Sequence, residues 1–204
     1  MNTPRFISAL ASSAATLLIV SACTINIGVP RDNSMMGSAG SNSSSTEQRE
    51  LMFALMMIPH HEQAVEMSEL ALANSNHDGV RDLARRIMDG QSVEIDIMQR
   101  WLDEADVADT RNGRLDHGMH GGSSMMGGMA SEADLRRLQT LSSPEFDREF
   151  LLLMIEHHEG ALDMVVMISG STSPEAQKLH DDIVDVQRAE IQEMQDMLGE
   201  LSDA

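Results

Sequence analysis

The amino-acid sequence predicts an all-α protein, an antiparallel four-helix bundle made of two repeated αα-hairpins. The first observation is an internal duplication: the segment FALMMIPHHEQAVEM at Phe53–Met67 returns as FLLLMIEHHEGALDM at Phe150–Met164. The second is that Met88–Leu102 aligns in the same way with Val184–Leu198. The third is helical periodicity in these segments, with no strand signal in the sequence. A repeated unit sets the fold before other features do, and two hairpins with short turns form a bundle.

Residues 1–22 predict a lipoprotein signal peptide. Arg5 precedes an apolar stretch, Phe6–Val20, which is the layout of an export signal. The following letters VSAC, which end at Cys23, resemble the bacterial lipoprotein cleavage box. This resemblance implies that Cys23 is lipidated and holds the mature chain at the extracytoplasmic face of the cell membrane. A plain signal sequence or a single membrane helix is the alternative, although the run is short for a span.

Residues 23–45 predict a flexible tether, because Ser, Gly and Asn dominate and no periodicity is present. The bundle domain is expected to cover residues 46–204 and to include a Met/His-rich loop at 108–130. Its first helix is expected at Thr46–Asn74, since Ser45 and Gln48 have the spacing of a capping box. The second helix is expected at Asp78–Val107.

Further helices are expected after the loop. Residues 131–141 predict a short helix. The pairs Ser143-Pro144 and Ser173-Pro174 predict the starts of two long helices, each with a capping Ser and with Pro at the first helical position. The hairpin turns fall near Asn76 and Ser171.

The composition excludes one class of partner. The formal net charge of −19 argues against nucleic acid, because phosphate binding depends on clustered Lys and Arg. Methionine is abundant, with 18 residues, and its ordinary role in a helix is to fill gaps in the core. An excess of methionine in a loop needs another explanation.

The helical wheel of the first repeat places a histidine in the apolar face. At about 100° per residue, one arc carries Pro59, Glu62, Glu66 and Glu69 and is expected in solvent. The core-facing arc carries Phe53, Met56, Met57, His60, Ala64, Met67 and Ala71, with His61 on its flank. In the second repeat Phe150, Leu153, Met154, His157 and Met164 face inward, and Glu156, Glu159 and Asp163 face outward. Glu62 and Glu159 are therefore not expected to belong to a site with the histidines.

The second helix of each hairpin adds polar groups to the core. Gln91, Glu94 and Met98 face inward in one copy, and Gln187, Glu190 and Met194 do so in the other. Folding each hairpin about its turn brings these side chains level with the double histidines. We expect His60, Glu94, His157 and Glu190 to be buried within hydrogen-bonding reach of one another or to share a metal.

A buried charge is costly unless it is paired or binds a metal. One interpretation is a pair of His–Glu hydrogen bonds that fix the helix register. The other is a metal site, because imidazole suits copper, zinc and iron, and thioethers favour Cu(I). A di-iron site requires Glu-x-x-His, and no histidine here has Glu three residues before it. The candidate core ligands are His60, His61, His157, His158, Glu94, Glu190, Met57, Met67, Met98, Met154, Met164 and Met194.

A second candidate site is the segment DHGMHGGSSMMGGM at Asp116–Met129. Its soft or borderline ligands are His117, Met119, His120, Met125, Met126 and Met129. They lie in a Gly-rich, adaptable chain, and the thioethers favour Cu(I). The alternative is a connector that is rich in Met but binds nothing.

Several of these motifs together resemble a known bacterial family. The segments FDREFLLLMIEHHEGALDM at Phe146–Met164 and MIPHHEQAVEM at Met57–Met67, with the Gln-x-x-Glu-Ile-x-x-Met stretches from Gln91 and Gln187, resemble domain-of-unknown-function family 305. The resemblance covers roughly Glu47 to Leu201. It implies a ferritin-like four-helix bundle that is usually exported, with some members linked to copper binding and copper tolerance. The family's histidine pairs carry over onto His60, His61, His157 and His158, while Leu153 departs from Met56 of the first repeat.

These observations predict an extracytoplasmic lipoprotein that binds or buffers copper, as Cu(I), in metal homeostasis or tolerance, without catalytic turnover. Its expected partners are the metal ion and the membrane that holds its lipid. A second copy of the chain or a protein that receives the metal is left open. The rival interpretations are a metal-dependent oxidase in the bundle core and a structural or interaction protein of the envelope that binds no metal.

Overall fold

The computed structural model describes residues 39–105 and 126–203, with side chains for 45–105 and 126–202. The helices are α1 (Ala39–Asn74), α2 (Asp78–Glu104), α3 (Glu132–Thr140), α4 (Glu145–Val165) and α5 (Pro174–Asp203). A short 3₁₀ helix, η3 (Val166–Ile168), follows α4 directly. The described part of the chain contains no strand.

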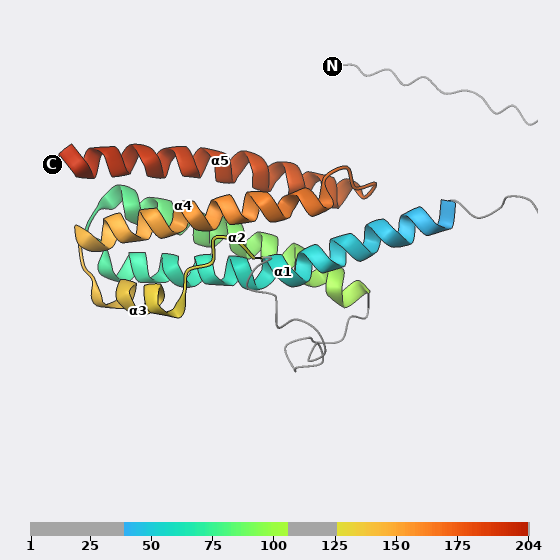
Figure 1. Cartoon of the computed structure of the whole chain (residues 1–204), viewed down its shortest axis with the longest axis horizontal. Helices are drawn as coiled ribbons and strands as arrows, with labels where there is room; N and C mark the ends of the chain where they lie inside the picture. The colour runs from blue at the N-terminus through green and yellow to red at the C-terminus, as the bar shows by residue number, and fades with distance from the viewer. Residues whose placement is uncertain (1–38, 106–125, 204) are drawn as a thin grey trace, which may run out of the picture. The chain divides into compact units, whose positions relative to one another are not determined.

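The long helices form an antiparallel bundle of two hairpins (Figure 1). α1 packs against α2 in one hairpin, α4 packs against α5 in the other, and α1 also packs against α4. The short helix α3 lies beside α1 and α4. The predicted fold class, an antiparallel four-helix bundle of two repeated hairpins, is confirmed.

The core consists of two apolar clusters separated by a polar layer. The first cluster is built around Ala64–Ala71, Val80–Ile87, Phe146–Met154 and Met194. The second is built around Phe53–Ile58, Met98, Ala161–Val165 and Ile183. Along each long helix the residues between the two clusters are polar: His60 and His61, Gln91 and Glu94, His157 and His158, Gln187 and Glu190. We call these eight residues the polar layer.

Three helix starts follow from local capping. The His77 side chain accepts a hydrogen bond from the backbone nitrogen of Val80 at the start of α2. Ser131 and Asp134 form a reciprocal capping box at α3. The Ser173 hydroxyl accepts a hydrogen bond from the backbone nitrogen of Ala176, 3.3 Å away, and α5 begins at Pro174, as the sequence predicts.

Two other boundaries differ from the sequence-based expectation. α1 begins at Ala39 and continues through Ser45, so Ser45 is not its N-cap. Once a helix is nucleated, adding residues of ordinary propensity costs little, and that lets the Ser-rich stretch join it. At α4, Pro144 itself occupies the N-cap position without a side-chain capping bond. The Ser143 hydroxyl instead accepts a hydrogen bond from the backbone nitrogen of Asn76, 2.7 Å away, and so links the two hairpins.

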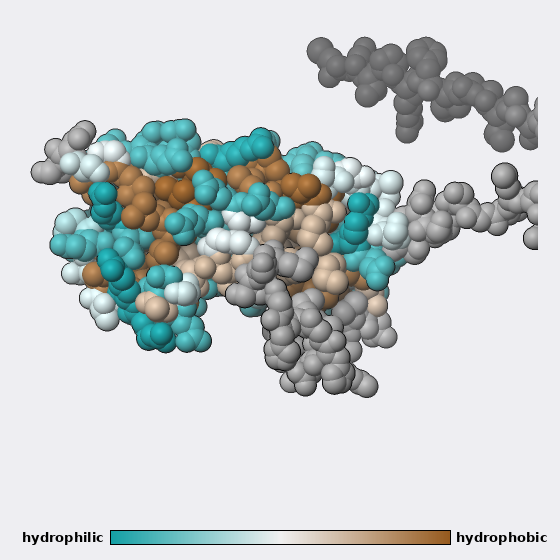
Figure 2. Space-filling model, viewed as in Figure 1, coloured by the Kyte–Doolittle hydropathy of each residue, from teal (hydrophilic) through white to brown (hydrophobic). Residues whose placement is uncertain are grey.

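The ends of the predicted organisation fall outside the described residues. These include the signal peptide, Cys23, the tether up to residue 38 and most of the Met/His-rich loop. The end of α2 is described, and it lies at Glu104 with Ala105 as the C-cap, rather than at the predicted Val107. Among the described helices none is long and apolar enough to cross a membrane. On the face shown in Figure 2, hydrophilic side chains cover much of the surface and hydrophobic ones gather along α4 and the adjoining side of α5.

Candidate metal centre

The centre of the polar layer is a pair of facing histidines. His60 of α1 and His157 of α4 lie with their ring centroids 3.7 Å apart and their planes at 35°. Both side chains are fully buried. The antiparallel packing of α1 and α4 places the two repeats at the same height. Equivalent histidines of the two repeats are therefore in contact.

The second histidine of each pair contacts a glutamate of the neighbouring helix. His61 Nε2 lies 2.7 Å from Glu94 Oε2 in the first hairpin, and His158 Nε2 lies 2.8 Å from Glu190 Oε2 in the second. The two imidazoles are fully buried, whereas the glutamate side chains are 14% and 10% exposed. Each hairpin thus contains one buried His–Glu pair.

This arrangement differs in one respect from the expectation based on the helical wheel. The wheel placed His61 on the flank of the apolar face and predicted that the glutamates lie close to His60 and His157. Both histidines of each pair are buried, and the glutamates contact the second one. The reason is that α1 packs on α2 and on α4 at once. Successive side chains point about 100° apart, so His60 faces α4 while His61 faces α2.

Many nitrogen and oxygen atoms of the polar layer lack a hydrogen-bond partner within the described structure. They are His60 Nδ1, His61 Nδ1, both ring nitrogens of His157, His158 Nδ1, and both amide atoms of Gln91 and Gln187. A buried polar atom without a partner typically costs about 1–3 kcal/mol. In native proteins buried polar groups are nearly always satisfied by other protein groups, by ordered water or by a bound ion. The concentration of unpartnered atoms in one layer therefore marks a place where water or a metal ion fits.

The central histidines are neutral at ordinary pH. Burial, and after it the nearby His61, lower the pKa of His60 to about 4. Burial is also the main reason that the pKa of His157 lies well below its usual range, with His60 as the next contribution. Neutral imidazole is the form that binds metals.

A short stretch that we call the strap, Met126–Ala130, covers the layer on the side of α1 and α4. His60 Nε2 lies 3.2 Å from the Gly127 carbonyl oxygen and donates to it. Gln63 holds the other end, since its Nε2 donates to the Ala130 carbonyl at 2.9 Å and its Oε1 accepts from the Ala130 nitrogen at 2.7 Å. With its proton on Nε2, His60 has its lone pair on Nδ1.

Close backbone contacts seat the strap on α4. A Cβ atom at Gly160 would lie 1.8 Å from the Gly127 carbonyl oxygen, and one at Gly128, whose φ is +79°, would lie 2.1 Å from the Glu156 carbonyl oxygen. Gly160 occupies the position in the second repeat that Gln63 occupies in the first. The site predicted from the sequence did not include Gln63, Gly127 or Gly160. The difference between Gln63 and Gly160 at equivalent positions of the two repeats is visible in the sequence.

The six helical methionines predicted as ligands are buried on the two sides of the layer. Met67, Met154 and Met194 belong to the first cluster, and Met57, Met98 and Met164 to the second. Each set contains one methionine from each of three helices, and the pseudo-twofold relation exchanges the sets. Glu62 and Glu159 are exposed, as expected.

The loop candidates are only partly described. His117, Met119, His120 and Met125 lie outside the described residues. Met126 and Met129 belong to the strap and are half-buried, and Met126 packs against the second cluster. Within the ranges that the structure describes, no group of three or more His, Cys, Asp or Glu side chains is arranged to hold a metal ion.

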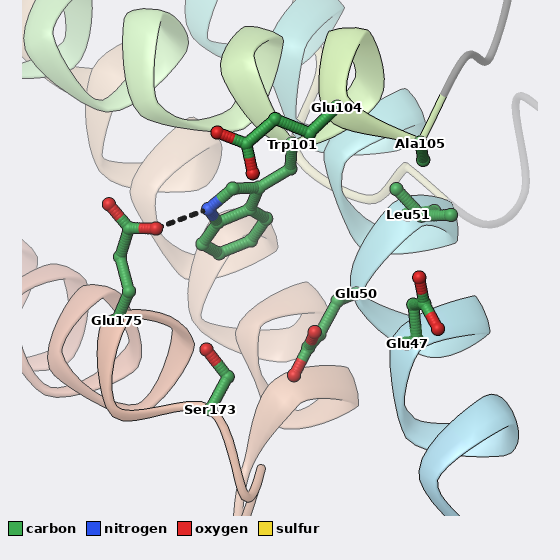
Figure 3. A pocket seen from close by; sticks show the side chains of 8 residues that line it. All are labelled: Glu47, Glu50, Leu51, Trp101, Glu104, Ala105, Ser173 and Glu175. Atoms are coloured by element: carbon green, nitrogen blue, oxygen red, sulfur yellow. Dashed lines mark hydrogen bonds between the residues drawn. The ribbon is translucent and has the colours of Figure 1, made fainter.

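A separate cavity of about 340 Å³ lies where α1 and α5 begin and α2 ends. Figure 3 shows the indole of Trp101 at its centre, with Glu47, Glu50, Glu104 and Glu175 around it. Trp101 Nε1 donates to Glu175 at 2.9 Å, and Arg100 pairs with the same carboxylate at 2.9 Å. None of the predicted metal ligands lines this cavity.

The fold and this site define a class: an internally duplicated, antiparallel four-helix bundle with a buried histidine layer. The chain belongs to the family described as domain of unknown function (DUF305), whose model matches residues 50–198. The resemblance seen in the sequence is thereby confirmed. No curated protein matches the chain.

Solved structures of the family resemble this chain along most of its length. A DUF305 protein of Streptomyces coelicolor, whose description places it among secreted proteins, is 31% identical, with a TM-score of 0.67 over 76% of this chain and 94% of that one. A DUF305 fragment from Deinococcus radiodurans is 34% identical, with a TM-score of 0.61 over 74% and 96%. CopM in its Cu(II)-bound form is 36% identical, with a TM-score of 0.59 over 74% and 96%. CopM has also been solved with Cu(I) and with silver.

Proposed function

We propose that this protein is an extracytoplasmic lipoprotein that binds and buffers Cu(I) in the core of its bundle, as part of copper homeostasis or tolerance. The observation that carries the proposal is the facing pair His60 and His157, whose buried, neutral rings have unpartnered nitrogen atoms within the described structure. The binding of Cu(I) and Cu(II) by CopM supports copper as the cargo.

The donor set suits a soft monovalent ion. His60 Nδ1 and a ring nitrogen of His157 supply neutral nitrogen ligands. Met57 and Met154 precede these histidines by three residues, so that each thioether shares a helix face with its histidine. Thioether and imidazole together favour Cu(I) over harder ions.

The outer pairs have an orienting role in this proposal. Glu94 and Glu190 accept hydrogen bonds from His61 and His158, and a carboxylate behind an imidazole fixes its tautomer and orientation. With the ring proton on Nε2, His61 Nδ1 and His158 Nδ1 keep their lone pairs.

The export and membrane attachment are part of the proposal. Residues 1–22 would direct export, Cys23 would carry the lipid, and the tether up to residue 38 would let the bundle stand away from the membrane. The secreted relative from Streptomyces coelicolor supports a location outside the cytoplasm.

Cu(I) titration of three variants against a chromophoric chelator tests the copper proposal. His60→Ala combined with His157→Ala should remove the core population. Deletion of residues 117–125, which leaves the strap in place, should remove only ions bound by that part of the loop. His180→Ala is the matched control, because His180 lies on α5 beside Asp181 and outside the polar layer. Binding by the double variant equal to that of the parent would refute the core site.

A structural role of the polar layer is the second candidate function. It is favoured by the two short His–Glu contacts, 2.7 and 2.8 Å, which tie α1 to α2 and α4 to α5 at a fixed register. A parent protein that binds no Cu(I) under reducing conditions but unfolds more readily when these pairs are broken would favour this role.

A further inference from the structure

The polar layer reaches the surface on the side opposite the strap. A narrow groove lies there between α2 and α5, with a volume of about 20 Å³. Gly90, Ile87 and Val186 line it together with the polar side chains of Arg86, Gln91, Glu94, Gln187 and Glu190. We call it the α2/α5 groove. A space of this size holds about one water molecule or one small ion. On the α1 and α4 side the strap covers the layer, so the groove is the more open approach to the histidines.

The glutamines of the groove are buried without partners. Gln91 is 4% exposed and Gln187 is 2% exposed, and in the described part of the chain neither amide nitrogen nor amide oxygen forms a hydrogen bond. The two occupy equivalent positions of the two repeats. Packing alone does not account for them, because an apolar side chain of similar volume would fill the space without leaving four unpaired atoms.

The charges around the groove favour a cation. Glu94 and Glu190 line the groove and are only slightly exposed. Arg86 is the positive group at the groove, and Glu193 of the facing helix pairs with it at 2.6 Å. Its charge is thereby offset, and the carboxylates leave the groove negative overall, which attracts cations.

The groove connects to the central histidines through short steps. The glutamate carboxylates touch His61 and His158. The ring centroid of His61 lies 6.3 Å from that of His60, and that of His158 lies 6.4 Å from that of His157. Oxygen ligands hold a soft ion weakly. An ion that binds the oxygen atoms of the groove is therefore readily transferred to the nitrogen and sulfur ligands of the core.

We propose that the α2/α5 groove is the entrance through which Cu(I) or Ag(I) reaches the core, with Gln91 and Gln187 supplying the first ligands. This inference rests on the proposed function of the histidine layer. Gly90 keeps the entrance open: it is exposed, and no atom of the described structure would lie within 4 Å of a Cβ there.

Gly90→Leu tests the entrance by filling it. Leucine has a higher helix propensity than glycine, so the helix should form as before. The matched control is Gly199→Leu, because Gly199 is also an exposed helical glycine with no described atom within 4 Å of a Cβ. Stopped-flow spectroscopy would follow transfer of Cu(I) from its bicinchoninate complex to the intact protein.

A blocked entrance lowers the rates of Cu(I) uptake and release but does not change the binding equilibrium. For Gly90→Leu we expect uptake and release both to slow by about tenfold or more, the effect of roughly 1.4 kcal/mol added to a barrier. The stoichiometry at equilibrium should match that of the parent and of Gly199→Leu. Gln187→Leu, which leaves Gly90 intact, should also slow uptake.

Two other results would overturn the proposal. Uptake by Gly90→Leu and by Gln187→Leu at the rate of the parent would show that the ion enters elsewhere. Faster uptake by Gln63→Ala, which releases the strap, combined with unchanged uptake by Gly90→Leu, would place the entrance between α1 and α4. If the parent protein takes up no Cu(I), the proposed function itself is refuted. That result comes from the parent protein alone and is therefore distinguishable from a failure of the entrance proposal.

Discussion

Glu94 and Glu190 each hold one buried imidazole through a single contact, 2.7 Å to His61 and 2.8 Å to His158. A hydrogen bond to a charged group contributes more than one between neutral groups, about 1.5–3 kcal/mol. Each His61 or His158 ring also keeps its other nitrogen unpartnered within the described structure. Loss of the carboxylate therefore removes the one partner that satisfies the ring.

Glu94→Ala should lower the free energy of unfolding of the metal-free protein by about 1.5–3 kcal/mol. The reason is that His61 Nε2 loses its acceptor while remaining buried. Urea unfolding followed by circular dichroism measures the change. Asp96→Ala is the control, since Asp96 is exposed on the same helix, and a loss within about 0.5 kcal/mol is expected there. Equal stability of Glu94→Ala and Asp96→Ala would contradict the role assigned to the pair.

The central histidines make stability depend on pH. In the folded chain the pKa of His60 is lowered to about 4, while the usual value is 6.5. Between these values the unfolded state binds more protons than the folded state, so stability is lost as the pH falls from about 6.5 to about 4. The difference corresponds to roughly 3 kcal/mol from His60 alone. Below about pH 4 the folded state binds the same proton and this loss stops.

Urea unfolding of the metal-free protein between pH 7 and pH 4 should show this decline. His60→Gln should make the decline shallower, because glutamine does not titrate. His180→Gln should follow the parent, because His180 lies on α5 beside Asp181 and outside the polar layer. A parent whose stability stays constant from pH 6.5 to pH 4 would show that the central pair is not kept neutral by burial.

At the scale of elements, α1 has two packing partners at the height of the site. It lies against α2 through His61 and against α4 through His60. The strap then crosses α4 at Gly160 and is fastened to α1 by Gln63. The same position of the repeat is thus Gln63 in the first copy, which holds the strap by hydrogen bonds, and Gly160 in the second copy, which leaves room for the strap backbone.

Gly160→Ala should displace the strap, because its Cβ would lie 1.8 Å from the Gly127 carbonyl oxygen. Overpacking of this kind typically costs about 1–3 kcal/mol. The amide hydrogen of Ala130, which Gln63 accepts, should exchange faster with solvent when followed by hydrogen–deuterium exchange. In Gly199→Ala no described atom meets the new Cβ, and a gain of up to about 1 kcal/mol is expected. Protection of Ala130 equal to that of the parent would refute the seating of the strap.

The sequence predicted the helices better than it predicted the polar contacts. The duplication and the Ser131 and Ser173 caps place three of the long helices and α3, because these are local signals. The start of α1 was missed, since helix propagation through a Ser-rich stretch leaves no sharp mark. The partners of His60 and His61 were also misassigned. A helical wheel that assumes a single core-facing direction does not show that α1 packs against both α2 and α4.

For the whole molecule, the pseudo-twofold relation brings equivalent residues together at one height. Two methionine-bearing clusters lie on either side of the polar layer. Neither hairpin alone contains the facing pair His60 and His157, so the centre exists only when both halves pack. The Met/His-rich segment joins the hairpins, and its described end is the strap.

The proposed attachment to the membrane is tested at Cys23. Cys23→Ala should release the protein from the membrane fraction or leave it unprocessed, because the cleavage box needs its cysteine. Fractionation and intact mass of the product measure both effects. The same membrane association and mature mass in parent and variant would refute lipidation.

The two candidate copper sites of the whole chain should respond differently to acid. Histidine ligands bind metal when deprotonated, whereas thioethers carry no proton to lose. A core site that used ordinary histidines would begin to lose affinity as the pH falls below about 6.5. The lowered pKa of His60, about 4, instead lets the core compete with protons until the pH approaches that value. The loop needs ordering on binding, which weakens its affinity.

Cu(I) titration of the loop-deleted protein, lacking residues 117–125 but keeping the strap, should therefore show an affinity that is little changed at pH 5.5 and falls as the pH approaches 4. The variant that combines His60→Ala with His157→Ala should keep only a weaker, loop-bound population, and this population should survive below pH 4 because its thioethers do not protonate. Circular dichroism at each pH separates loss of metal from unfolding. If the loop-deleted protein released its Cu(I) between pH 7 and pH 6, the buried histidines would not be the ligands.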